Sequence, residues 1–387
     1  MSVTIFMNLE INGNNFVIKK FNRSDLNNKL IHQWKELELR SFEGNAYLSP
    51  HFILPAIKYL TPSKEIYFIF IYLVADYKDI LTGFGVFEYS YGTKQFPLPH
   101  LKSYLTIHSY LSGLLIDSEF VDSTLAAFFE YTRKFPKFCC GIEFIKRPGQ
   151  TDLAKRIDLV AAQISVPWHQ YNHHKRAILI PKNMSQETID TLFSKRKKKN
   201  LRHCRNQLTK IGEVQWHYIP GDRVDNGCID RFLQLENMGW KCEKESSLLA
   251  NPDYETFFRE MVAGFSKNNQ VFFTELLVDG RSIASTANLL SANSGFAFKI
   301  GWDTAFAAAS PGILNEIEFI KEAAELLPQI EYIDSGAGEG SFIEKIWVDN
   351  YLLVSGFFLT KSHYKILIYI FDFFRNIKRF VNKLKYR

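Results

Sequence analysis

The order of elements expected between residues 271 and 334 constrains the fold most. Two apolar, β-rich runs flank Asp279-Gly280, a dipeptide that favours the tight turn of a β-hairpin. A further strand, a helix and a last strand are then expected at residues 295–301, 313–326 and 330–334. Hairpin, strand, helix and strand in this order are typical of an α/β fold with mixed sheets.

The first half of the chain has a similar layout. Apolar residues at Leu26, Leu30, Trp34 and Leu37 recur at helical spacing and predict a helix over residues 25–39. Later elements are predicted as a helix after Pro50, strands at 66–74 and 80–89, a helix at 120–134 and a strand at 138–145. The fold class expected is therefore α/β (α+β), with two similar halves at 1–180 and 181–360, followed by a tail at 361–387.

Composition and cysteine usage favour an ordinary globular protein. Of the 387 residues, 46% are hydrophobic and 23% charged, and a chain of this length can build a core without metal or disulfides. Five cysteines without a CxxC pair argue against a disulfide framework or a zinc site. No secretory signal is recognisable, and the apolar run at 66–75 is shorter than the about 20 residues that span a bilayer. A cytoplasmic location is expected.

Two basic segments stand out from a nearly neutral chain. Residues 194–212 hold eight Lys or Arg and no acid, and residues 361–387 hold eight Lys or Arg and one acid, Asp372. The first segment could be a solvated helix face or could contact an anionic substrate. Nucleic acid is the least favoured partner, because the segment has no interleaved aromatic residues.

The tail predicts an amphipathic helix over residues 366–387. Ile370, Phe373, Ile377 and Phe380 fall on one face, with basic residues on the other. Such a helix can lie on the anionic inner face of a plasma membrane, which would make the protein peripheral there. The alternative is a terminal helix packed on the protein with its basic face in water.

Residues 296–314 are the best candidate for a binding site. A strand is followed by a loop of small residues and then by a helix beginning near Ser310-Pro311-Gly312. Free N–H groups and a partial positive charge at a helix N-terminus can hold a phosphate. Ser310, Gly312, Ile313 and Leu314 are therefore the predicted phosphate-binding residues. The alternative is an ordinary Pro-Gly helix start with Ser310 as its cap.

Three charged residues near the same strands are catalytic candidates. Asp303 and Asp334 each follow a predicted strand, where ligand clefts of open α/β sheets lie. Either could be a general base, or simply a capping residue. Lys299 lies inside an apolar strand and needs a partner there. An ion pair with Asp303 or Asp334, contact with a phosphate and a catalytic role are all open.

Several short motifs occur in an order that resembles one known family. They are NAYLSP at 45–50, the basic helix at 196–212 with Lys199, Asn200, Arg202 and Arg205, Gly239-Trp240-Lys241, FKIGWD at 298–303, Ser310-Pro311-Gly312, and Asp334-Ser335-Gly336-Ala337. Together they resemble the CelD-like acyltransferases of cellulose and exopolysaccharide biosynthesis, which carry a GNAT-type domain related to FemAB peptidyltransferases. Cys242 and Gly336 depart from the family pattern, and the basic residues expected after Trp347 are missing.

The resemblance implies two fused GNAT-like halves and an acyltransferase that needs no metal. The acyl donor would be acyl-CoA or acetyl-CoA, and the acceptor a hydroxyl or amine of a cell-envelope or exopolysaccharide precursor. Lys199, Arg202, Trp240 and Lys241 would bind that substrate. A Gly312→Val change is expected to weaken CoA binding and leave the fold intact. FemAB-like aminoacyl transfer from charged tRNA to a peptidoglycan precursor, and a non-catalytic scaffold with this fold, are the alternatives.

Overall fold

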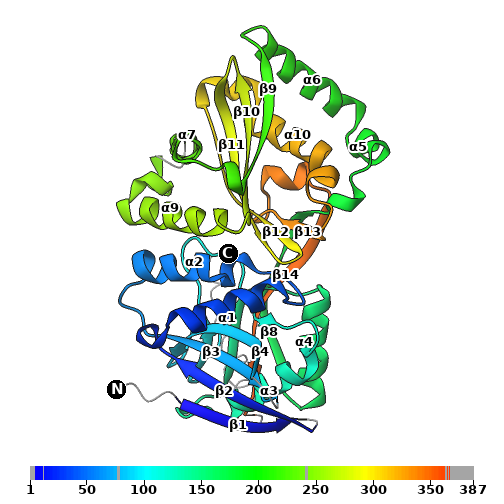
Figure 1. Ribbon diagram of the computed structural model, residues 1–387. Coiled ribbons are helices and arrows are strands. Elements are labelled where there is room, and N and C mark those ends of the chain that lie inside the picture. The colour runs from blue at the N-terminus through cyan, green and yellow to red at the C-terminus, as the bar shows by residue number, and fades with distance from the viewer. Residues whose placement is uncertain are drawn as a thin grey trace, which may run out of the picture. The chain divides into compact units, whose positions relative to one another are not determined.

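The computed structural model describes residues 5–11, 13–75, 79–239, 243–361, 364 and 366 (Figure 1). The chain forms two compact units, each assembled from separated stretches. Unit 1 takes Met1–Phe42, Lys64–His174 and Leu352–Arg387, and unit 2 takes Glu43–Ser63 and Lys175–Tyr351. The division into halves at residue 180 stays a prediction.

The sheet of unit 1 begins as an antiparallel meander and continues through a parallel pair. Its strand order is β1 (Ile5–Ile11), β2 (Asn14–Phe21), β3 (Ile66–Leu73), β4 (Ile80–Ser90), β5 (His100–Ser103), β7 (Gly141–Pro148) and β14 (Asp349–Leu359). A short strand, β6 (Leu115–Ile116), pairs with β4. The parallel pair is β5 and β7, which are joined along the chain through the helix α3 (Val121–Arg133).

Helices cover both faces of this sheet, which explains the continuous apolar sequence of β3. Trp34 of α1 (Asn28–Leu39) packs against Phe68 of β3 from one side. Ile69 and Ile71 point to the other side, into the core shared with α3 and α4 (Asp152–Gln163). The helix predicted from residue 25 begins later, because the Asn27 side chain accepts the Leu30 N–H and so caps α1 at Asn28.

The strands of unit 2 are also arranged as a mixed sheet. The order is β9 (Val214–Pro220), β10 (Val271–Val278), β11 (Arg281–Ser291), β12 (Ser294–Trp302), β13 (Tyr332–Asp334) and the end of β8 (Trp168–Leu179). Strands β9 to β12 are antiparallel, and β12 and β13 are parallel. The predicted hairpin is confirmed, and its turn residues Asp279 and Gly280 have φ of 48° and 74°.

Different helices cover the two faces of the unit 2 sheet. The first face carries α10 (Pro311–Leu326), α5 (Gln186–Leu192) and α6 (Lys195–Thr209). The second carries α7 (Asn226–Glu236), α9 (Pro252–Ser266) and α2 (Pro50–Pro55), whose Phe52 packs on Phe257 and Phe298. The basic helix expected over residues 196–212 runs from Lys195 to Thr209, and the Ser194 side chain caps its start by accepting the Lys197 N–H.

The predicted α/β fold class, with mixed sheets flanked by helices, is confirmed. Within the described residues, no helix combines the length and the apolar character needed to cross a bilayer. The tail helix predicted over residues 366–387 lies outside the described residues, apart from Ile366.

Candidate active site

Strand β12 runs beside β13 for only a short distance. The parallel pairing comprises Ser294–Tyr332, Gly295–Ile333 and Phe296–Asp334, and β13 ends there. Strand β12 continues to Trp302 with β11 as its partner. The edge of β12 beyond Phe296 is therefore not hydrogen-bonded to β13, so an extended ligand could lie along it.

A β-bulge in β12 lies just beyond its last pair with β13. Ala287 of β11 pairs with Lys299 and Asn288 pairs with Ala297, so Phe298 is the extra residue on β12. A bulge bends its strand and can place two successive side chains on one face. Phe298 accordingly stacks on Phe258 of α9, and the Lys299 side chain also reaches the α7 and α9 face.

Lys299 forms a buried ion pair with Glu236, the last residue of α7. Its Nζ lies 3.0 Å from Glu236 Oε1, and the side chains are 10% and 0% exposed. The other carboxylate oxygen accepts the Leu248 N–H at 2.7 Å. The partner of Lys299 is thus neither Asp303 nor Asp334, the two candidates considered from the sequence, but Glu236, which was not predicted. The sequence does contain a sign that Glu236 is buried, because it lies on the same face of α7 as the apolar residues Ile229, Phe232 and Leu233.

Gly301 allows α7 to approach β12 closely. A Cβ atom added at Gly301 would lie 2.3 Å from the backbone nitrogen of Glu236. The helix backbone therefore rests directly on the strand, and this contact holds the Glu236 carboxylate beside Lys299.

The loop after β12 leads to the positive end of α10. Asp303 begins this loop by accepting the Ala305 N–H at 2.9 Å and by forming an ion pair with Arg281. Ser310 has a left-handed backbone, with φ of 49°, and its side chain makes no capping bond. The backbone N–H groups of Gly312 and Ile313, in the first turn of α10, therefore receive no hydrogen bond from the Ser310 side chain. This turn also contains no acidic residue. Such a helix end fits an anionic group.

Gly312 also has a packing role. A Cβ atom at this position would lie 3.3 Å from Trp302 Cδ1 and 3.4 Å from Ile300 Cδ1. The missing side chain lets α10 pack on β12. A valine at position 312 would require the Trp302 and Ile300 side chains to shift, and the expectation that Gly312→Val leaves the fold intact stays a prediction. The backbone N–H of Gly312 remains a proposed phosphate contact.

Asp334 is held at the end of β13 by three groups. Its Oδ1 accepts the Gly336 N–H at 2.6 Å and lies 3.3 Å from Arg176 Nη1, and its Oδ2 accepts the Tyr351 hydroxyl. Burial opposes the charge of Arg176, but the Asp334 carboxylate outweighs this and raises the pKa of the guanidinium. Asp303, Asp334 and Lys299 thus each have a separate partner, namely Arg281, Arg176 and Glu236.

The remaining predicted residues are spread over unit 2. Lys199 and Arg202 are exposed on α6, Ile313 is half-buried, and Leu314 is buried against Cys204 and Leu208 of α6. Trp240 and Lys241 lie outside the described residues. No group of three His, Cys, Asp or Glu side chains placed to hold a metal occurs among the residues that the structure describes.

A buried polar cluster that the sequence analysis missed anchors α10 to the sheet. Asn315 donates to Thr274 Oγ1 at 2.9 Å and accepts the Trp216 indole N–H at 3.0 Å. Next to it, Thr286 donates to Glu316 Oε1 at 2.7 Å. Complete burial raises the pKa of Glu316 to about 7, although the hydrogen bond from Thr286 opposes the rise.

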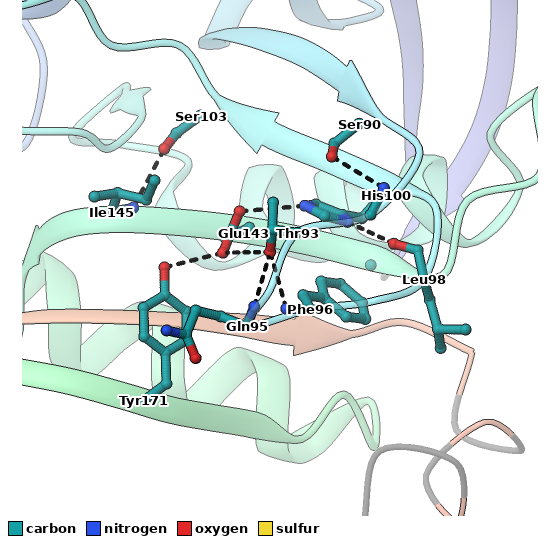
Figure 2. A network of polar contacts seen from close by, with 12 residues as sticks. Ser90, Thr93, Gln95, Phe96, Leu98, His100, Ser103, Glu143, Ile145 and Tyr171 are labelled. Carbon is teal, nitrogen blue, oxygen red and sulfur yellow. Dashed lines mark hydrogen bonds and ion pairs between the residues drawn. The ribbon is translucent and has the colours of Figure 1, made fainter. Parts of the chain in front are cut away.

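Unit 1 contains a different polar cluster, which bridges its own parallel strands (Figure 2). His100 Nε2 of β5 lies 3.2 Å from Glu143 Oε2 of β7, and both side chains are buried. Tyr171 donates its hydroxyl proton to Glu143 Oε1 at 2.9 Å, and His100 Nδ1 lies 2.6 Å from the Leu98 carbonyl oxygen. Burial works against the carboxylate, but the bonds from His100 and Tyr171 outweigh it and lower the pKa of Glu143.

Comparisons with known proteins agree with this architecture. The sequence profile described as "Acetyltransferase (GNAT) domain" matches residues 195–342, which include β12, α10 and β13. The structure of FemX is similar over 90% of this chain and 99% of that one, with a TM-score of 0.56 and 10% identity. A C-terminal domain (DUF2156) from Agrobacterium fabrum, described as part of a lysylphosphatidylglycerol synthetase, covers 84% of this chain and 90% of its own, with a TM-score of 0.50 and 10% identity. No functionally curated protein matches the sequence.

These findings define a class of protein. The match to a GNAT acetyltransferase domain over residues 195–342, all of them within unit 2, identifies the protein as an acyltransferase. The GNAT fold implies an acyl-CoA donor, and the acid-free start of α10 is chemically suited to the phosphates of such a donor.

Proposed function

We propose that unit 2 transfers an acyl group from acyl-CoA or acetyl-CoA to a hydroxyl or amine of a cell-envelope or exopolysaccharide precursor. The observation that carries the proposal is that β12 continues to Trp302 beyond its last pair with β13, and that the loop after it leads to a helix N-terminus that the Ser310 side chain does not cap. The choice of acceptor rests on the resemblance to CelD-like proteins.

The donor would extend from α10 along the free edge of β12. The N–H groups of Gly312 and Ile313 would bind the pyrophosphate, with Ser310 and Leu314 shaping this first turn. In the transfer step, the acceptor oxygen or nitrogen bonds to the thioester carbonyl carbon and the C–S bond breaks. The acceptor loses a proton in this step, and the departing thiolate takes up a proton and leaves as the free thiol.

The acceptor would approach from the face that carries α7 and α9. Lys299 is the cation nearest the bulge, and its ammonium could stabilise negative charge that develops on the carbonyl oxygen. Glu236 would position Lys299 through their 3.0 Å contact. Asp303 and Asp334 remain proposed bases, although each already binds an arginine. Trp240, Lys241, Lys199 and Arg202 remain proposed substrate contacts.

A matched pair of substitutions at Ala308 tests the donor site. Ala308 is exposed and lies two residues before Ser310, so its replacement disturbs little packing. Ala308→Asp places a negative charge near the proposed phosphates, whereas Ala308→Asn has nearly the same shape without the charge. We expect calorimetry with CoA to show at least about tenfold weaker binding for the Asp variant. Equal affinities of the two variants would place the phosphates elsewhere.

One specific feature favours a second candidate, aminoacyl transfer from charged tRNA to a peptidoglycan precursor. The eight Lys and Arg residues of 194–212, without an acid, could follow an RNA backbone. Calorimetry that detects charged tRNA but neither CoA nor acyl-CoA would support this candidate over the first. Binding of none of these ligands would favour a scaffold.

A further inference from the structure

The exposed side of α6 carries an unusual number of cations that no acid neutralises. Lys195, Arg196, Lys199 and Arg202 are all exposed. Among the described residues, the ion pairs of α6 involve only Arg205, which contacts Glu318 at 2.6 Å. We call these four exposed cations the α6 basic face. Figure 1 shows α6 along the outer side of unit 2, between α5 and β9.

The positions of these charges oppose helix stability. Residues 195–199 are five successive Lys or Arg residues in the first turns of α6, where the helix dipole is already positive. No acid stands in the first turn to compensate. Cations at the N-terminus of a helix do not stabilise it. Binding to an anionic partner gives a physical reason for the basic residues at 195–199.

Exposed apolar side chains adjoin the start of this face. The Lys197 ammonium donates to the Lys345 carbonyl, which brings the start of α6 next to η8 (Phe342–Lys345). Phe193 and Ile343 belong to the same core cluster and hold these two elements together. Beside them, Phe342 is 39% exposed and Val348 is 52% exposed. Cations next to exposed apolar side chains suit the headgroup region of an anionic bilayer.

We propose that the α6 basic face, with Phe342 and Val348 beside it, binds the surface of a membrane that contains anionic lipid. The apolar face of α6 packs on the protein through Cys204 and Leu208, so the helix would rest on the headgroups without inserting. The neighbouring apolar side chains favour lipid over RNA as the partner. The proposal depends neither on the acyl transfer nor on the tail at 366–387.

Vesicle co-sedimentation with the full chain tests this surface. The variant Lys195→Gln, Lys199→Gln, Arg202→Gln removes three cations from the α6 basic face. The control Lys29→Gln, Lys94→Gln, Lys134→Gln removes three exposed cations of unit 1 that form no ion pair among the described residues. We expect the affinity for vesicles that contain phosphatidylserine to fall on the order of 100-fold for the first variant, and far less for the control. Thermal unfolding should show both variants folded.

Two further measurements separate lipid from other anions. Wild-type binding should vanish without phosphatidylserine and weaken as salt rises from about 0.1 M to about 0.5 M. Phe342→Ser with Val348→Ser should reduce vesicle binding several-fold and leave binding to an RNA homopolymer unchanged. Equal vesicle binding by the two triple variants would overturn the proposal. RNA binding that depends on α6, without vesicle binding, would overturn it as well.

Discussion

At the scale of single residues, Glu316 is an acid placed where a charge is costly. Its carboxyl is wholly buried, and burial raises its pKa to about 7 from the ordinary value of 4.5. The folded protein therefore binds this proton more tightly than the unfolded chain does. The stabilisation is complete below about pH 4.5 and is lost as the pH rises to about 7.

A neutral side chain of the same shape should remove this pH dependence. For Glu316→Gln we expect little change in the free energy of unfolding at pH 5 and a gain on the order of 2 kcal/mol over wild type at pH 8. Urea unfolding at the two pH values measures the difference. Glu322→Gln, an exposed change on the same helix, is the control. A Glu316→Gln effect that does not vary with pH would contradict the prediction.

At the scale of elements, the contact of α7 with β12 depends on Gly301. A Cβ atom there would lie 2.3 Å from backbone, which cannot move aside as a flexible side chain can. We expect Gly301→Ala to destabilise the fold by about 2 kcal/mol or more, as overpacked cores do. The control is Gly338→Ala, where a Cβ atom meets nothing within 4 Å. Chemical denaturation of both variants gives the comparison, and equal stabilities would show that α7 adjusts freely.

Local sequence signals were sufficient for the elements that have them. Asp279-Gly280 marked the hairpin, and the helical spacing of Leu30, Trp34 and Leu37 marked α1, where all three are buried. The strands β8 and β14 were missed, because polar residues interrupt them or flank them. Strand β2 was missed although the sequence Asn12-Gly13, a typical hairpin signal, directly precedes it. The predicted strand at 138–145 begins only at Gly141.

Long-range pairing explains why the site was only partly predicted. The sequence located the strand and the helix start at 296–314, since both are local features. The partner of Lys299 is Glu236, 63 positions away along the chain, and no local pattern connects the two. Likewise, residues 43–63 join unit 2 through Tyr47 and Phe52, which contact Phe296 and Phe298. Contacts of this kind become visible only in the folded chain.

At the scale of the whole molecule, the two units have the same strand–helix–strand order but differ where a donor would bind. In unit 2, β12 parts from β13, and α10 begins without an acid. In unit 1, the buried His100–Glu143 pair bridges β5 and β7, and α3 has Asp122 in its first turn. A carboxylate at a helix N-terminus competes with a phosphate for the same N–H groups.

We therefore expect a single CoA molecule to bind per chain. Titration calorimetry should give a stoichiometry near one, and Ala308→Asp should reduce the affinity of that one site. A second, independent binding event of similar affinity would indicate that unit 1 also takes a donor.

The interleaving of the two units along the chain has a consequence for biosynthesis. A nascent chain leaves the ribosome with residues 43–63 long before Lys175–Tyr351, the part of unit 2 that they join. Unit 1 must in turn wait for Leu352 and the rest of β14, which pairs with β7. Apolar strands such as β3 are thus translated well before the sheet that buries them is complete. Domains that finish late in translation expose apolar surface for longer. Folding of this acyltransferase is therefore expected to be largely post-translational, with exposed strands that a chaperone could protect.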